Sequence, residues 1–148
     1  MRAVTEVEFH TGVDDPVHFA CRLLRKAYRQ GETLLVTAPV STLEALDRAL
    51  WTFAAHEFIP HRRLGADMPS PAVVAGTPIW LSDGPAPTPC PPILVNLGAP
   101  MPTTLGAFSR VIELLATDPD EVRAGRARWR DYAARGLNIK HHSAGAPS

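Results

Sequence analysis

The sequence lacks several features that would assign it to a particular class of protein. It has only two cysteines among 148 residues, Cys21 and Cys90, which are too few for a disulfide framework and match no metal-ligand spacing. No uncharged apolar run reaches the roughly 18 residues that a membrane span needs, and no apolar segment follows the first residues as in a secretion signal. We therefore expect a protein of the reducing cytoplasm without a membrane anchor.

An excess of charge of one sign is also absent, because 15 basic residues balance 15 acidic ones. Bulk charge therefore gives no reason to expect strong binding to nucleic acid or to a membrane surface. Apolar residues make up 45% of the chain, which excludes a disordered composition and suffices for a buried core. We predict a single α/β domain over residues 1–140 and a flexible C-terminal tail over residues 141–148.

Strands and helices are expected to alternate in the first third of the chain. Residues 6–10 alternate polar and apolar side chains, as a strand with one buried face does. An aspartate and a proline then begin a helix with apolar residues at helical spacing over residues 16–31. Residues 33–38 form a short β-rich run, and residues 41–44 have the form of a capping box that opens a second helix ending near Trp51.

The remaining two thirds of the chain predict three more strands and one more helix. Prolines and glycines interrupt every period over residues 53–78, which we interpret as loop with short extended pieces. Strands are expected at residues 78–82, 93–97 and 111–115, and a helix at residues 118–136. Apolar strands that alternate with amphipathic helices predict a three-layer, Rossmann-like sandwich with a mainly parallel central sheet and helices on both faces.

Residues that would carry catalysis or bind a cofactor are not evident. The turns at residues 10–16 and 38–41 contain neither a glycine-rich phosphate-binding motif nor a Walker lysine. His56 and His61 have no partner at metal-ligand spacing, so we interpret both as partly exposed loop residues, and His141 and His142 fall in the predicted tail. We predict no catalytic residue, no cofactor and no metal. The alternative is a small enzyme that uses a nucleotide or sugar phosphate at the sheet edge.

The last helix is the most informative segment, because residues 121–135 contain five arginines and only two acidic residues. Helical spacing places an apolar stripe on one face, formed by Val122, Gly125, Trp129, Tyr132 and Ala133. Arg126 and Arg130 border this stripe, which suits an acidic, partly apolar peptide. Two other interpretations remain: a core helix with a solvated basic face, and direct binding of single-stranded DNA.

Around this helix the chain resembles the chi subunit family of bacterial DNA polymerase III. The resemblance runs from about Thr33 to Ile139 with matching order and spacing. It rests on LLVTA at 34–38, LDRALW at 46–51, EFIPH at 57–61, PIW at 78–80, ILVNL at 93–97, RARWRDY at 126–132 and Gly-Leu-Asn at 136–138.

The resemblance implies a non-catalytic accessory subunit with an α/β fold and no working nucleotide site. Such a subunit links the clamp-loader complex to single-stranded-DNA-binding protein by binding the acidic C-terminal tail of that protein, which ends in phenylalanine. Arg126 and Arg130 match the residues that bind carboxylates. Val122 stands where the family pattern has a basic residue, so Arg123 is expected to supply part of the charge. The apolar part of the pocket is expected to be lined by Trp129, Leu115 and Val122.

The resemblance also implies a second binding surface, formed by Trp51, Phe58 and Pro60. Its expected partner is the psi subunit of the clamp loader or an accessory helicase, and psi does not accompany chi in every bacterium. Exposed aromatic side chains are typical of such an interface. Contact with DNA is expected to be mainly indirect, through these protein partners.

Overall fold

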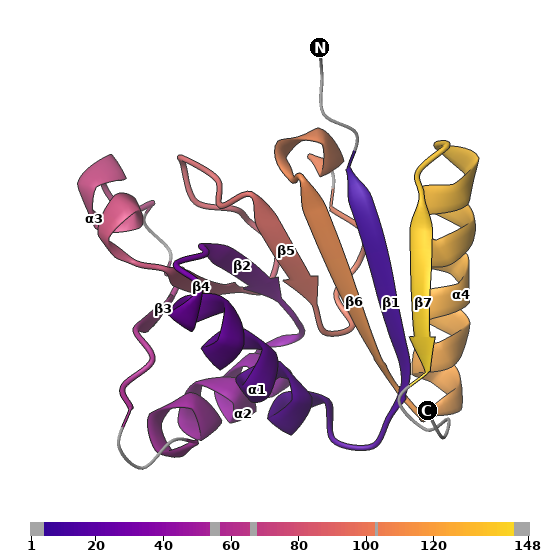
Figure 1. Ribbon diagram of the computed structural model, residues 1–148, viewed down its shortest axis with the longest axis horizontal. Coiled ribbons are helices and arrows are strands. Elements are labelled where there is room, and N and C mark those ends of the chain that lie inside the picture. The colour runs from indigo at the N-terminus through magenta and orange to yellow at the C-terminus, as the bar shows by residue number, and fades with distance from the viewer. Residues whose placement is uncertain (1–4, 54–56, 66–67, 103, 144–148) are drawn as a thin grey trace.

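A seven-stranded sheet forms the middle layer of the protein, as the computed structural model shows for residues 5–53, 57–65, 68–102 and 104–143 (Figure 1). The strands lie in the order β3-β4-β2-β5-β6-β1-β7, and every pair of neighbours is parallel. Their bounds are β1 Glu6–Val13, β2 Leu34–Thr37, β3 His61–Arg63, β4 Ile79–Ser82, β5 Ile93–Asn96, β6 Arg110–Ala116 and β7 Ile139–Ser143.

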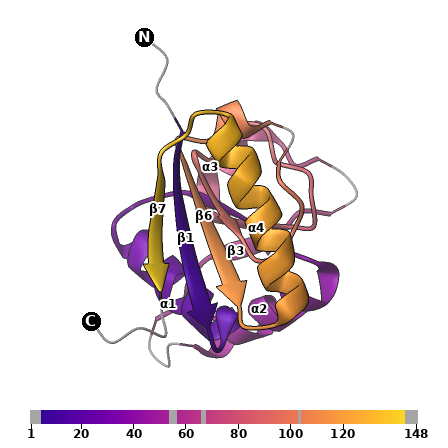
Figure 2. The same cartoon turned by 90° about the vertical axis from the view of Figure 1, so that its right-hand side faces the viewer.

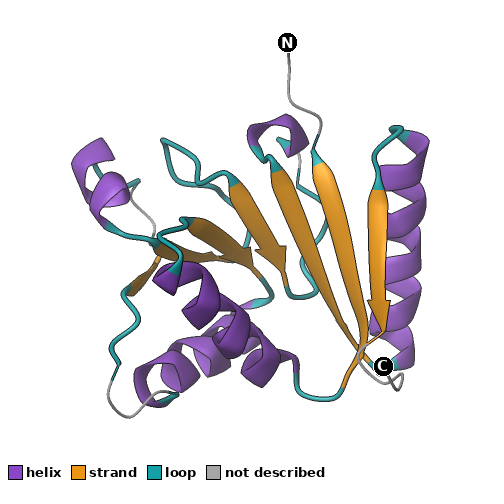
Figure 3. Cartoon of the chain, viewed as in Figure 1, coloured by secondary structure: helices purple, strands orange, loops and turns teal. Residues whose placement is uncertain are grey.

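Helices cover both faces of this sheet (Figures 2 and 3). The helices are α1 Pro16–Arg29, α2 Val40–Thr52, α3 Pro71–Gly76 and α4 Pro119–Ala134, with a short 3-10 helix, η1, at Leu105–Ala107. In β2, Leu34 and Val36 pack with α1 and α2, whereas Leu35 packs with Tyr132 of α4 in a second core. This alternation gives each face of the sheet its own apolar core, and it confirms the predicted three-layer α/β fold.

The predicted starts of the first and last helices are confirmed, and that of the second is wrong. The Asp15 side chain accepts a hydrogen bond from the backbone N–H of His18, and Asp118 caps α4 in the same way. In α2 the extended Pro39 precedes the first helical residue and no side chain caps the helix. Ser41 therefore lies inside the first turn, because Pro39, whose ψ of 153° is extended, is the last residue before the helix and the helix begins at Val40.

The segment predicted as mostly loop contains two elements that its weak periodicity conceals. Strand β3 is three residues long, pairs with β4 at the edge of the sheet, and buries His61 but neither of its two arginines. Helix α3 begins where Ser70 accepts a hydrogen bond from the backbone N–H of Val73. Both elements are too short for an apolar pattern to repeat. His61 is buried, so its interpretation as a partly exposed loop residue is wrong, and His56 lies outside the described residues.

The predicted boundary of the flexible tail is also wrong, because residues 141–143 belong to strand β7. This strand pairs in parallel with β1 along its whole length, and Asn138 accepts a hydrogen bond from the backbone N–H of Val7 at 3.1 Å. The segment is polar and exposed because it is an edge strand, so no apolar alternation signals it in the sequence. Residues 144–148 lie outside the described residues.

Candidate functional site

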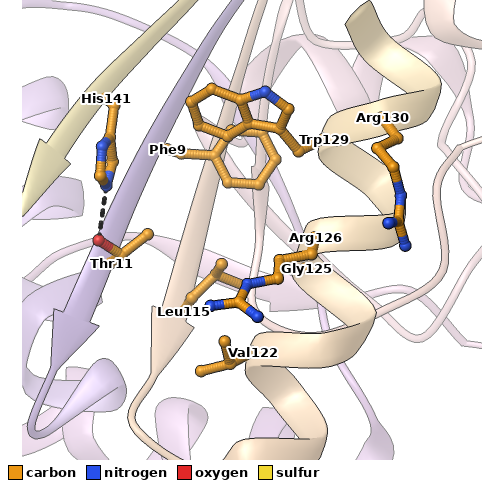
Figure 4. Close-up of a pocket in the computed structure, with 9 residues that line it drawn as sticks. All are labelled: Phe9, Thr11, Leu115, Val122, Gly125, Arg126, Trp129, Arg130 and His141. Carbon is orange, nitrogen blue, oxygen red and sulfur yellow. Dashed lines mark hydrogen bonds between the residues drawn. The ribbon is translucent and has the colours of Figure 1, made fainter.

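An apolar pocket of about 540 Å³ opens between helix α4 and the β6-β1-β7 side of the sheet (Figure 4). Its size falls in the range of about 300–1,000 Å³ that is typical of ligand sites. The pocket is lined by Phe9 and Thr11 of β1, Leu115 of β6, His141 of β7, and Val122, Gly125, Arg126, Trp129 and Arg130 of α4. The site therefore joins β1, near the start of the chain, to the consecutive elements β6, α4 and β7.

The aromatic wall of the pocket is held by contacts among its own members. The ring of Trp129 lies 4.8 Å from that of Phe9 and 5.7 Å, edge to face, from that of His141. His141 is further held by a hydrogen bond of 2.7 Å between its Nε2 and the hydroxyl of Thr11. Because these contacts restrain the rings, the wall is preorganised for an apolar ligand.

Gly125 lets helix α4 approach the sheet closely at the floor of the pocket. A Cβ atom at this position would stand 2.4 Å and 2.7 Å from the two methyl groups of Leu115, closer than atoms can pack. Only glycine allows the observed approach. Leu115 and Val122 can therefore lie at the same pocket floor, on neighbouring elements.

The two arginines of the pocket differ in their placement (Figure 4). Both are exposed, and neither forms an ion pair within the described residues. Arg126 extends toward Leu115, whereas the guanidinium of Arg130 turns away from strand β1. Arg123 does not line the pocket, and its guanidinium contacts the carboxylate of Asp120 at 2.6 Å. Arg126 is thus the cation closest to the apolar floor and free to meet an anionic ligand.

A buried ionic network underneath α4 was missed by the sequence analysis. Arg128 is 7% exposed, and its Nε donates to both carboxylate oxygens of Glu113 on β6, at 3.1 Å and 3.2 Å. The Tyr132 hydroxyl and the Asn96 amide donate to the same carboxylate, at 2.8 Å and 3.2 Å. Burial raises the pKa of Glu113, and these three donors offset part of the rise. Burial also raises the pKa of Tyr132, so its hydroxyl stays a donor.

This network determines which arginines of α4 are available at the surface. Arg128 lies on the buried face with Gly125 and Tyr132, so it does not contribute to a solvated basic face. Since Arg128 and Tyr132 are both bound to Glu113, the helix cannot rotate without breaking these bonds. Arg126 and Trp129 are thereby held at the pocket. A glutamate inside the apolar strand at residues 111–115 was the one signal that a buried cation was needed.

A second feature lies at the other end of the molecule, where two large aromatic side chains are exposed. Trp51 at the end of α2 is 60% exposed and Phe58 is 57% exposed, and their rings lie 5.2 Å apart. The buried His61 ring contacts Trp51 edge to face and hydrogen-bonds to Asp47 at 2.7 Å. Pro60 is half-buried in the same loop. Of the three residues predicted for a second surface, Trp51 and Phe58 are thus in ring contact, and Pro60 follows Phe58 in the same loop.

Comparison with known proteins assigns the chain to a family. The sequence model of the family described as "DNA polymerase III chi subunit, HolC" matches residues 4–140. The chain belongs to the chi subunit family of DNA polymerase III. It is 33% identical over 144 residues to the DNA polymerase III subunit chi of Pseudomonas aeruginosa, covering 94% of this chain and 96% of the relative. It is 26% identical over 130 residues to the subunit chi of Haemophilus influenzae, covering 85% of each chain.

Family membership confirms the resemblance noted in the sequence. The structure also shows where the residues predicted for the pocket lie. Of the six residues predicted for a tail-binding pocket, all but Arg123 line the pocket beside α4. Phe9, Thr11, Gly125 and His141 complete the lining and were not predicted as site residues. Among the described residues, no helix of this chi family member is long and apolar enough to cross a bilayer.

Proposed function

We propose that this chain is a non-catalytic accessory subunit of the cytoplasmic DNA polymerase III holoenzyme that binds the acidic C-terminal tail of single-stranded-DNA-binding protein. In this role it links the clamp-loader complex to DNA that is already coated by that protein. The observation that carries the proposal is an apolar pocket bordered by arginines that have no acidic partner in the described chain. The ligand that such a pocket favours is both apolar and anionic.

The chemistry of a tail that ends in phenylalanine matches this arrangement group by group. The phenyl ring is expected to pack against Trp129 and Phe9 above the floor formed by Leu115. The terminal carboxylate, or an acidic side chain just before it, is expected to bind the guanidinium of Arg126. The guanidinium of Arg130 turns away from strand β1, and Arg123 does not line the pocket, so both are expected to act through longer-range attraction to the acidic tail.

A fluorescence-anisotropy titration tests this proposal. The probe is a labelled peptide that copies the tail of the host protein, and the comparison is between wild type, Arg126→Ala, Trp129→Ala and Arg48→Ala. Arg48 is an exposed arginine of α2 and is the matched control for loss of one positive charge. Wild type is expected to bind saturably in the micromolar range, with a loss of about tenfold or more in the two pocket variants, equal to about 1.4 kcal/mol.

Two further comparisons separate the pocket from general charge attraction. A peptide of the same composition with its phenylalanine moved away from the C-terminus is expected to bind at least about tenfold more weakly. Arg123→Ala is expected to lose less than about threefold, because Arg123 does not line the pocket. Equal losses in Arg48→Ala and Arg126→Ala, or indifference to the position of the phenylalanine, would contradict the proposed site.

We infer a second partner, the psi subunit or an accessory helicase, for the surface formed by Trp51, Phe58 and Pro60. Two exposed aromatic rings in contact are the kind of anchor that protein interfaces use. Co-purification with each partner that the host encodes is the test, with Trp51→Ala and Trp129→Ala as reciprocal controls. Each variant is expected to lose one partner and keep the other. Loss of both partners in either variant would contradict two separate surfaces.

A further inference from the structure

Strand β7 places two adjacent histidines on opposite faces of the sheet. In the parallel pairing with β1, His141 stands opposite Phe9 and His142 stands opposite His10. Paired residues of neighbouring strands project to the same face, and successive residues alternate between faces. His141 therefore lines the pocket beside α4, whereas His142 lies on the other face with His10. Glu8, two residues before His10, projects to that same face.

These three side chains bring possible metal ligands close together. Their ligand atoms all lie within 4.8 Å of one another, and the Nε2 of His10 is 3.7 Å from the carboxylate of Glu8. Two ligands bound at about 2.0–2.1 Å to one tetrahedral Zn²⁺ ion stand about 3.4 Å apart. The His142 ring stacks on that of His10 with centroids 4.8 Å apart, and it is exposed, so a side-chain rotation can aim a nitrogen at a shared ion.

Neighbouring groups orient two of the three ligands. The guanidinium of Arg110 donates to both oxygens of Glu8 at 3.1 Å, and the ring of Phe19 on α1 lies 5.2 Å from that of His10. Bound carboxylates in metal sites commonly accept such outer hydrogen bonds. The positive charge of Arg110, with Lys26 in the adjacent cavity, also opposes a cation. We therefore expect micromolar rather than tighter affinity.

We propose that Glu8, His10 and His142 form a binding site for one divalent transition-metal ion such as Zn²⁺. Two imidazoles and one carboxylate leave the fourth position of a tetrahedral ion open to water or to a group of a partner protein. The site lies on the opposite face of the sheet from the peptide pocket. Its donor set favours Zn²⁺, Cu²⁺ or Ni²⁺ over Mg²⁺ or Ca²⁺, which prefer oxygen ligands alone.

Zn²⁺ titration of the full-length, tag-free, chelator-treated chain tests this site by competition with a chromophoric chelator. The variants are His142→Ala, His10→Gln and His141→Ala, of which the last is the matched control from the same strand and the opposite face. Wild type is expected to bind one equivalent, and the first two variants are expected to lose about tenfold or more in affinity. The control is expected to bind as wild type does, and excess Mg²⁺ is expected not to compete.

A second measurement does not depend on whether a variant folds. Paramagnetic Co²⁺ added to the wild-type chain is expected to broaden the ring resonances of His10 and His142 before those of the other histidines. The proposal is overturned by no binding at about 1 mM Zn²⁺. It is equally overturned by a loss in His141→Ala that matches the loss in His142→Ala, or by unchanged affinity in His10→Gln.

Discussion

Replacement of Gly125 by alanine sets two opposing effects against each other at the floor of the pocket. Alanine in place of glycine inside a helix ordinarily adds about 1 kcal/mol of stability. Here the new methyl group would stand 2.4 Å, 2.7 Å and 3.1 Å from three atoms of Leu115, which is 5% exposed. Leu115 must then move as a whole, and overpacking of this kind costs about 1–3 kcal/mol. We expect a net loss of about 1 kcal/mol.

Urea unfolding measures this loss of stability when the dependence of the unfolding free energy on urea concentration is fitted as one value shared by all variants. The fluorescence-anisotropy titration measures the affinity of the pocket for the tail peptide. Because Leu115 must enter the pocket or push α4 outward, Gly125→Ala is also expected to weaken peptide binding. Ala127→Gly, at an exposed position of the same helix, is the control: it is expected to lose about 1 kcal/mol of stability with unchanged affinity. Removal of the clashing side chain, in Leu115→Ala with Gly125→Ala, is expected to give a combined loss smaller than the sum by about 1 kcal/mol or more. A Gly125→Ala chain that is more stable than wild type and binds as well would refute this reasoning.

Three further predictions concern groups that the core holds in place. Arg128→Met is expected to lower the free energy of unfolding in urea by about 3–5 kcal/mol, because it leaves the Glu113 carboxylate buried without a cation; a loss below about 1 kcal/mol would contradict this account. Burial raises the pKa of the Cys21 thiol to about 11, so mass spectrometry at pH 8 should find Cys21 alkylated only after unfolding, and rapid labelling of the native chain would argue against its burial. Asp47→Ala is expected to lower the free energy of unfolding by about 1–3 kcal/mol in the same urea assay, because the buried His61 ring loses its hydrogen bond to the Asp47 carboxylate. Unchanged stability would contradict this expectation and would show that water replaces the carboxylate.

The layers of the fold could be predicted from the sequence because each long element carries its own periodic pattern. Strands β2 and β5 each begin with three apolar residues, β6 is apolar apart from Arg110 and Glu113, and α1 and α4 have an aspartate cap followed by proline. The order of the strands does not follow from such local patterns, since it depends on contacts between distant segments. Strands β3 and β7 were not predicted because they are the two edge strands of the sheet. An edge strand is held by backbone hydrogen bonds to the neighbouring strand and does not need a pattern of apolar residues of its own.

The candidate site could be predicted in part, for a related reason. Helical spacing identifies Val122, Trp129 and the adjacent arginines as one face, but it cannot show which face the sheet covers. Arg128 is a charged residue in a basic helix, so its burial becomes evident only when Glu113 of β6 lies opposite it. Phe9 and His141 join the pocket through the pairing of β1 with β7, a contact between the two ends of the chain.

The tandem histidines of β7 make this edge tolerant of small errors in strand alignment. Insertion of one residue before Ile139 would move His141 opposite His10 and Lys140 opposite Phe9, so the face toward α1 would keep an imidazole. Deletion of one residue would instead move His142 opposite Phe9 and Ser143 opposite His10, so the pocket would keep its ring. A slip of one residue in either direction therefore removes a histidine from only one of the two faces. Insertion or deletion of a single residue in the turn before β7 would thus separate the proposed peptide binding from the proposed metal binding without any substitution in the strand itself.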